Sequence, residues 1–79
     1  MSIQKKMQLI LIRKVLMEEN QRFWESFHKY AYYEVAELHL KESKRLMNVK
    51  ISEIRTYEQA EEFIHNTRRI SLDDWINSL

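Results

Sequence analysis

The clearest pattern in the chain is a 3.6-residue period of apolar side chains in its middle third. Five apolar residues recur at intervals of three or four and share an arc of about 80° on a helix: Trp24, Phe27, Ala31, Val35 and Leu38. Helix-favouring Ala, Glu, Lys and Leu are frequent in this segment. The pattern predicts a long amphipathic helix within residues 21–47, with this arc facing the core. A short strand over residues 36–40, where apolar and polar residues alternate, is the alternative.

The same segment predicts a second apolar face. Tyr33 and Leu40 would project almost opposite Trp24 on this helix, beside the basic residues Arg22 and Lys29. A surface helix is normally polar on that side, so we expect both sides to be covered. The cover would be either the other helices of the chain or a second protein.

The C-terminal third carries two signals for a helix start. Thr56 and Gln59 match a capping box, which predicts a helix from about residue 57 to 65. Ser71 and Asp74 match a second one. The short helix after it would carry one apolar stripe: Leu72, Trp75, Ile76 and Leu79.

The N-terminal third is ambiguous between helix and strand. On a helix, residues 7–17 place apolar side chains almost all round, which is typical of a buried helix. On a strand, residues 8–13 could pair with a second short strand near 47–52, although a two-stranded sheet alone is marginal. We favour the helix. The predicted class is therefore mainly α, with α+β as the alternative. Asn20, Asn48 and Asn66 are the expected segment boundaries, because Asn adopts left-handed turns more readily than most residues.

Composition narrows the range of functions. The 79 residues include no Gly, Pro or Cys, so a P-loop, a dinucleotide-binding turn, disulfides and thiolate metal sites are excluded. The length fits one domain over residues 1–79. The apolar run at residues 9–12 is too short for a membrane span or a signal peptide, and we expect a cytoplasmic protein.

Charged residues suggest two kinds of chemistry, nucleic-acid binding and metal binding, of which only the first is a serious alternative. Four cations gather near the end of the predicted long helix and could bind nucleic acid, together with nearby tyrosines: Lys41, Lys44, Arg45 and Lys50. Two Glu-x-x-His pairs, at 25 and 28 and at 62 and 65, have a spacing used by metal-binding bundles, but chance alone yields such pairs among ten Glu and three His. No nucleophile lies beside a base in any known motif, so we expect no enzyme, metal or cofactor.

These observations predict a small helical protein-interaction module with no catalytic activity. We expect it to form a homodimer or to bind a larger partner, as an adaptor, regulator or inhibitor. Nucleic-acid binding is the alternative. The expected interface residues come from the second face and the C-terminal stripe: Arg22, Lys29, Tyr33, Leu40, Trp75 and Leu79.

Overall fold

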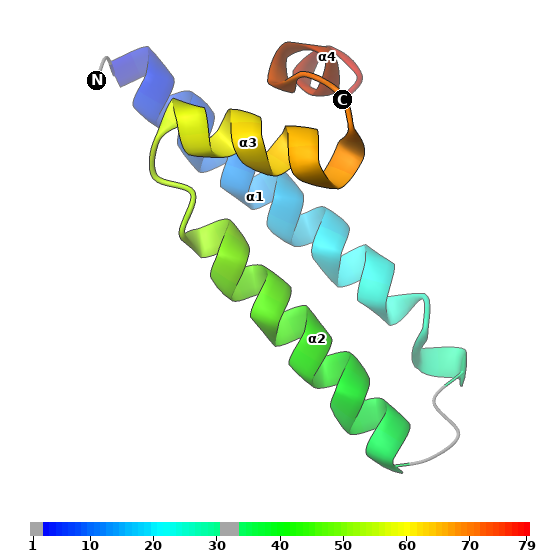
Figure 1. Ribbon diagram of the computed structural model, residues 1–79. Coiled ribbons are helices and arrows are strands. Elements are labelled where there is room, and N and C mark those ends of the chain that lie inside the picture. Colours follow the sequence, from blue (N-terminus) through cyan, green and yellow to red (C-terminus); the bar gives the residue numbers. More distant parts are fainter. Residues whose placement is uncertain (1–2, 31–33) are drawn as a thin grey trace. The chain divides into compact units, whose positions relative to one another are not determined.

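The computed structural model describes residues 3–30 and 34–79, and 85% of these residues are helical. Four α-helices and one 3₁₀-helix follow one another, and the described residues include no strand: α1 (Ile3–Glu25), η1 (His28–Tyr30), α2 (Glu34–Ser52), α3 (Tyr57–Arg68) and α4 (Leu72–Asn77). The mainly α class is confirmed. Strands near 8–13 and 47–52 are wrong, because these residues lie inside α1 and α2 (Figure 1).

The predicted long helix within residues 21–47 is wrong in its bounds. The longest helix is α1, with 23 residues. Of the predicted arc, Trp24 lies near the end of α1, Phe27 in the turn after it, and Val35 and Leu38 in α2, whereas Ala31 lies outside the described residues. The chain leaves α1 where the Ser26 hydroxyl donates to the Phe23 carbonyl at 2.6 Å and the Phe27 N–H donates to the Trp24 carbonyl at 3.1 Å. Such bonds to the third residue back tighten a helix end.

The asparagines do not mark the segment boundaries. Asn20, Asn48 and Asn66 all lie within helices. The left-handed position that ends α3 is taken by Arg69, with φ 60° and ψ 27°, and its N–H donates to the His65 carbonyl. The left-handed conformation costs a residue with a Cβ roughly 1–2 kcal/mol of conformational free energy. In this chain, which has no Gly, Arg69 adopts it where α3 ends.

The chain forms two compact units that share α1. The terminal unit comprises Met1–Ile12 and Ile54–Leu79, and the hairpin unit comprises Arg13–Glu53. In the hairpin unit, α2 runs back along the second half of α1 (Figure 1). That residues 1–79 form a single domain, as their length indicates, stays a prediction.

The terminal unit holds most of the apolar core. Its buried side chains come from α1, α3, α4 and the residues before α3: Leu9, Ile12, Ile54, Ala60, Ile64, Leu72 and Trp75. The first part of α1 is a helix as predicted, but it is buried along one side only. Its other side leaves four apolar side chains exposed: Ile3, Met7, Ile10 and Leu11.

Both predicted N-caps are present, at the starts of α3 and α4, and the first of them forms the complete capping box. Thr56 accepts from the Gln59 N–H at 3.1 Å, and the Gln59 side chain accepts from the Thr56 N–H at 3.1 Å. Ser71 accepts from the Asp74 N–H at 3.1 Å at the start of α4. Each cap accepts from backbone N–H groups that the first turn leaves unpaired, and such a cap typically stabilises a helix by about 1 kcal/mol.

Tyr57 links three helices of the terminal unit. The Lys5 ammonium from α1 lies 5.3 Å from the centre of its ring, and its hydroxyl donates to Asp73 of α4 at 3.2 Å. Burial, the charge of Asp73, the hydrogen bond to Asp73 and the charge of Glu61 raise the pKa of Tyr57 above its ordinary value of 10.0. The folded chain therefore favours the neutral phenol.

This raised pKa predicts a loss of stability at alkaline pH. Neutral Tyr57 stabilises the fold below about pH 10, the pKa of an unfolded tyrosine, and that contribution is lost as the pH rises through the higher folded pKa. We expect the free energy of unfolding to fall less steeply above pH 10 in Tyr57→Phe than in the native chain. Denaturant titrations at a series of pH values measure both slopes. Equal slopes would show that Tyr57 titrates alike in the folded and unfolded chains.

Candidate functional site

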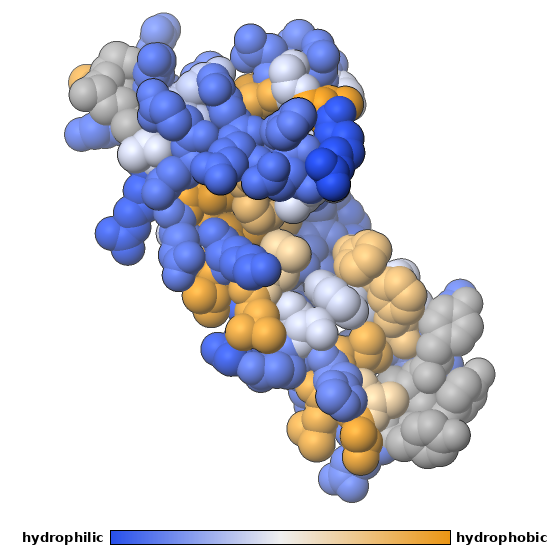
Figure 2. Space-filling view, viewed as in Figure 1, coloured by the Kyte–Doolittle hydropathy of each residue, from blue (hydrophilic) through white to orange (hydrophobic). Residues whose placement is uncertain are grey.

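The most conspicuous surface of the hairpin unit is an apolar stripe on the outside of α2. It consists of Val35, Leu38, Leu46 and Val49, with exposed fractions of 63%, 61%, 48% and 41%. At 100° per residue these four side chains share an arc of about 80°. We call this surface the outer stripe. Figure 2 shows hydrophobic side chains between hydrophilic ones on the visible surface of α2.

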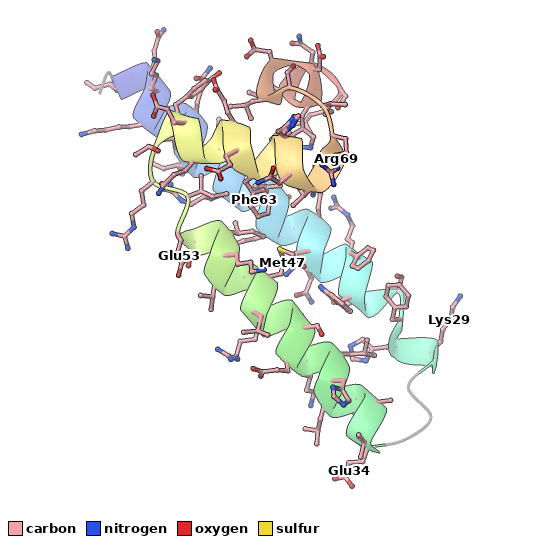
Figure 3. The ribbon with its side chains drawn as sticks, viewed as in Figure 1. Lys29, Glu34, Met47, Glu53, Phe63 and Arg69 are labelled. Atoms are coloured by element: carbon pink, nitrogen blue, oxygen red, sulfur yellow. The ribbon has the colours of Figure 1, made fainter. Side chains whose placement is uncertain are left out.

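The opposite side of α2 supplies the packing against α1. Ile51 is buried, and Leu40, Lys44 and Met47 are half-buried on this side. Figure 3 shows Met47 pointing from α2 toward α1. Helix α2 is therefore apolar on two sides. Its inner side is covered by α1 within the unit, whereas the outer stripe is exposed.

A paired carboxylate and guanidinium interrupt the outer stripe. Glu42 lies between Leu38 and Leu46 on the same arc, and it accepts two hydrogen bonds from Arg45, at 3.1 Å from Nε and 2.5 Å from Nη2. This bidentate bond holds the pKa of Glu42 below its usual value and raises that of Arg45. The stripe is therefore apolar at both ends and carries a neutralised ion pair in the middle.

The structure separates the predicted interface residues. Tyr33 lies outside the described residues. Leu40 is half-buried on the inner side of α2, and Trp75 is buried with 4% of its surface exposed, so neither presents a free apolar surface. The remaining three are exposed, and Figure 3 shows Lys29 projecting outward from η1: Arg22, Lys29 and Leu79.

The outer stripe was missed because the two faces of the central segment were interchanged. The apolar arc was extended from Trp24 through a break in the helix, which assigned Val35 and Leu38 to the core. A signal was present in residues 34–52 alone. Val35 and Leu46, and likewise Leu38 and Val49, are 11 residues apart, a period that keeps them on one side of a helix.

The four predicted nucleic-acid ligands do not form a uniform basic face. Lys41 pairs with Glu37 at 3.7 Å and Arg45 pairs with Glu42. Lys44 is half-buried on the inner side, and Lys50 lies about 140° round the helix from Arg45. Cations that are dispersed and paired with carboxylates attract phosphates less strongly than a contiguous basic patch does.

An aromatic cluster closes the α1 end of the hairpin unit. The Phe23 ring lies 5.1 Å from the Trp24 ring and 5.1 Å from the Phe27 ring, both edge-on, and Trp24 and Phe27 are 5.9 Å apart. Phe23 is exposed, and the buried Nε1 of Trp24 finds no acceptor among the described residues. These rings add to the apolar surface that the hairpin unit leaves open to solvent.

The two Glu-x-x-His pairs do not form a metal site in the described part of the chain. Glu25 ends α1 while His28 begins η1, and Glu62 and His65 are both exposed on α3. Within residues 3–30 and 34–79, no three His, Asp or Glu side chains lie close enough to hold a metal ion. None of the helices there has the length and apolar content needed to cross a membrane. No protein-family model, curated protein or solved structure matches the chain, so its function has to be inferred from this geometry.

Proposed function

We propose that this chain is a small protein-interaction module that associates with a second copy of itself through the outer stripe of α2. The observation that carries the proposal is the exposure of Val35, Leu38, Leu46 and Val49 on one side of a helix whose other side is already packed. Exposed apolar side chains gathered on one side of a helix cost free energy in water, and covering them by a second protein recovers that cost.

The size of the chain supports the same proposal. A domain of about this length rarely gains more than 3–5 kcal/mol from its own core, so oligomerisation is a common way to stabilise it. The cores of the two units comprise nine buried apolar side chains among the described residues, while thirteen large apolar side chains remain exposed there. Association would cover part of this surface.

The proposal predicts that charge on the outer stripe dissociates the dimer. Leu38→Glu with Leu46→Glu introduces two carboxylates into a surface that loses water on association. We expect the dissociation constant to rise by about tenfold or more. Sedimentation or light scattering over a range of concentrations gives the mass, and helical circular dichroism shows whether the variant stays folded, as expected for side chains outside both cores.

The first part of α1 offers a matched control. Ile10 and Leu11 are 57% and 59% exposed, so Ile10→Glu with Leu11→Glu repeats the same chemistry at similar exposure on another helix. We expect this variant to keep the native mass. If it alone dissociates the dimer, the interface lies on α1. A native chain that stays monomeric at every concentration would rule out self-association.

A further inference from the structure

The outer stripe has the same order of residues from either end. Val35, Leu38, Glu42, Leu46 and Val49 follow one another at intervals of three, four, four and three residues. At 1.5 Å per residue, the two valines lie about 10 Å from Glu42 along the axis, on either side, and the two leucines about 6 Å from it. The stripe is therefore symmetric about Glu42.

We propose that two copies of the chain pair through this stripe in an antiparallel arrangement, with the twofold axis passing beside Glu42. Val35 then packs against Val49 of the second copy, and Leu38 against Leu46 of the second copy. This geometry rests on the proposed function and specifies its partner. A twofold interface needs a surface that is complementary to itself, and a symmetric stripe meets that need directly.

The charges along α2 favour the antiparallel direction. The first half of the helix carries Glu34, Glu37 and Glu42 against Lys41, whereas the exposed charged residues of the second half are the cations Arg45 and Lys50. Figure 3 shows Glu34 at the start of the helix, far from its C-terminal end. Antiparallel pairing places the acidic half over the basic half of the second copy and opposes the two helix dipoles. Parallel pairing would place like charges together.

The central ion pair fixes the register. In the antiparallel pair, two Glu42–Arg45 ion pairs meet at the axis, and each carboxylate keeps the bidentate bond that it has within its own chain. A shift by one helical turn would place Glu42 against Leu38 or Leu46 of the second copy and remove it from water among apolar side chains. Polar residues within otherwise apolar helix interfaces commonly select register in this way.

Cysteine cross-linking tests the direction and the register. The chain contains no Cys, so each introduced thiol is the only one present. Three variants are compared with a short bismaleimide: Glu42→Cys, Val35→Cys and Val49→Cys. In the proposed pair, position 42 faces position 42 of the second copy. Position 35 faces position 49 of the second copy, and it therefore lies about 21 Å along the helix from position 35 of that copy.

The expected pattern is specific to the antiparallel pair. Glu42→Cys cross-links to itself, Val35→Cys and Val49→Cys alone do not, and a mixture of these two gives a cross-linked dimer. Cross-linking within the dimer should be roughly tenfold or more faster than for the same thiols in the monomeric Leu38→Glu/Leu46→Glu background.

Other patterns separate the failure of this geometry from the failure of self-association. Efficient self-cross-linking of Val35→Cys and of Val49→Cys would show a parallel pair and overturn the proposal. A dimer by mass in which none of the three variants cross-links would place the interface elsewhere, leaving self-association intact while excluding this arrangement. A monomer by mass for the native chain and all three variants would overturn both.

Discussion

Replacing Ile64 by Ala should remove about 2–5 kcal/mol from the free energy of unfolding. Ile64 is fully buried in α3, at 0% exposure, and belongs to the core of the terminal unit. The substitution removes three carbon atoms from a close-packed site and leaves a cavity that its neighbours fill only in part. Because a domain of this size rarely has more than about 3–5 kcal/mol available, much of the variant should be unfolded at 37 °C.

Denaturant unfolding followed by circular dichroism measures this loss at a fixed protein concentration, since association would add a concentration-dependent term. Ile3→Ala is the matched control, because it makes the same change at a helical position that is 77% exposed. It should change stability by less than about 0.5 kcal/mol. Equal losses for the two variants would contradict the placement of Ile64 in the core.

The same measurement examines whether residues 1–79 unfold as one domain. Leu16, at 1% exposure, lies in the hairpin unit, whereas Ile64 lies in the terminal unit. If the two units form one cooperative domain, Leu16→Ala and Ile64→Ala each shift a single common transition to lower denaturant. Two separate transitions, each moved by one of the variants, would show that the units unfold independently.

The helices of the C-terminal third could be predicted because their start signals are local. A capping box needs two side chains and the backbone of one turn, all within four residues, and nothing distant has to be known. Thr56 with Gln59, and Ser71 before α4, form their capping bonds as expected. The missing Gly and Pro likewise favoured helix throughout, and that class was confirmed.

The central third could not be divided correctly from the pattern alone. The 3.6-residue period of apolar residues continues in the sequence even where the chain turns and the helix ends. No Gly or Pro marks the break after Glu25. The predicted arc crosses this break, so the directions it gives to Val35 and Leu38 of α2 are wrong. The arc therefore assigned Val35 to the core and Leu40 to the surface, whereas Val35 is exposed and Leu40 is half-buried.

Apolar residues on two sides of α2 are nevertheless common to the prediction and the structure. A second apolar face could be predicted from the number of apolar residues and their angular spread, whichever of the two faces packs against α1. Only the three-dimensional structure shows which of the two faces remains exposed to solvent. That choice depends on the packing of α1 against α2, which is a contact between residues more than 20 positions apart.

Asn20 shows most directly what the sequence could not reveal. The sequence predicts a turn at this residue, but Asn20 is buried in α1 with 7% of its surface exposed. Its side-chain amide donates to the Asn48 side-chain oxygen at 2.9 Å and to the Lys44 carbonyl at 3.1 Å, both on α2. An Asn that caps a turn and an Asn that joins two helices look the same in a sequence, because the partner lies 28 residues away.

Asn20→Leu should cost about 1–3 kcal/mol of unfolding free energy. The variant removes both hydrogen bonds and leaves the half-buried Asn48 side-chain oxygen beside an apolar group. Denaturant unfolding of Asn20→Leu, Asn48→Leu and the double variant forms a thermodynamic cycle. We expect a coupling free energy of about 0.5–3 kcal/mol between the two positions, because they share one bond.

The double variant, Asn20→Leu with Asn48→Leu, separates stability from specificity. Replacing both partners by apolar side chains can be almost neutral for stability, so much of the loss should be recovered. The hairpin would then lose the two hydrogen bonds by which Asn20 of α1 holds α2 in place, and an all-apolar contact tolerates more than one register. We expect native-like unfolding free energy together with broadened amide resonances in α2. Sharp resonances at native positions would show that apolar packing alone sets the register, and additive losses in the cycle would show that the bond between Asn20 and Asn48 does not couple the helices.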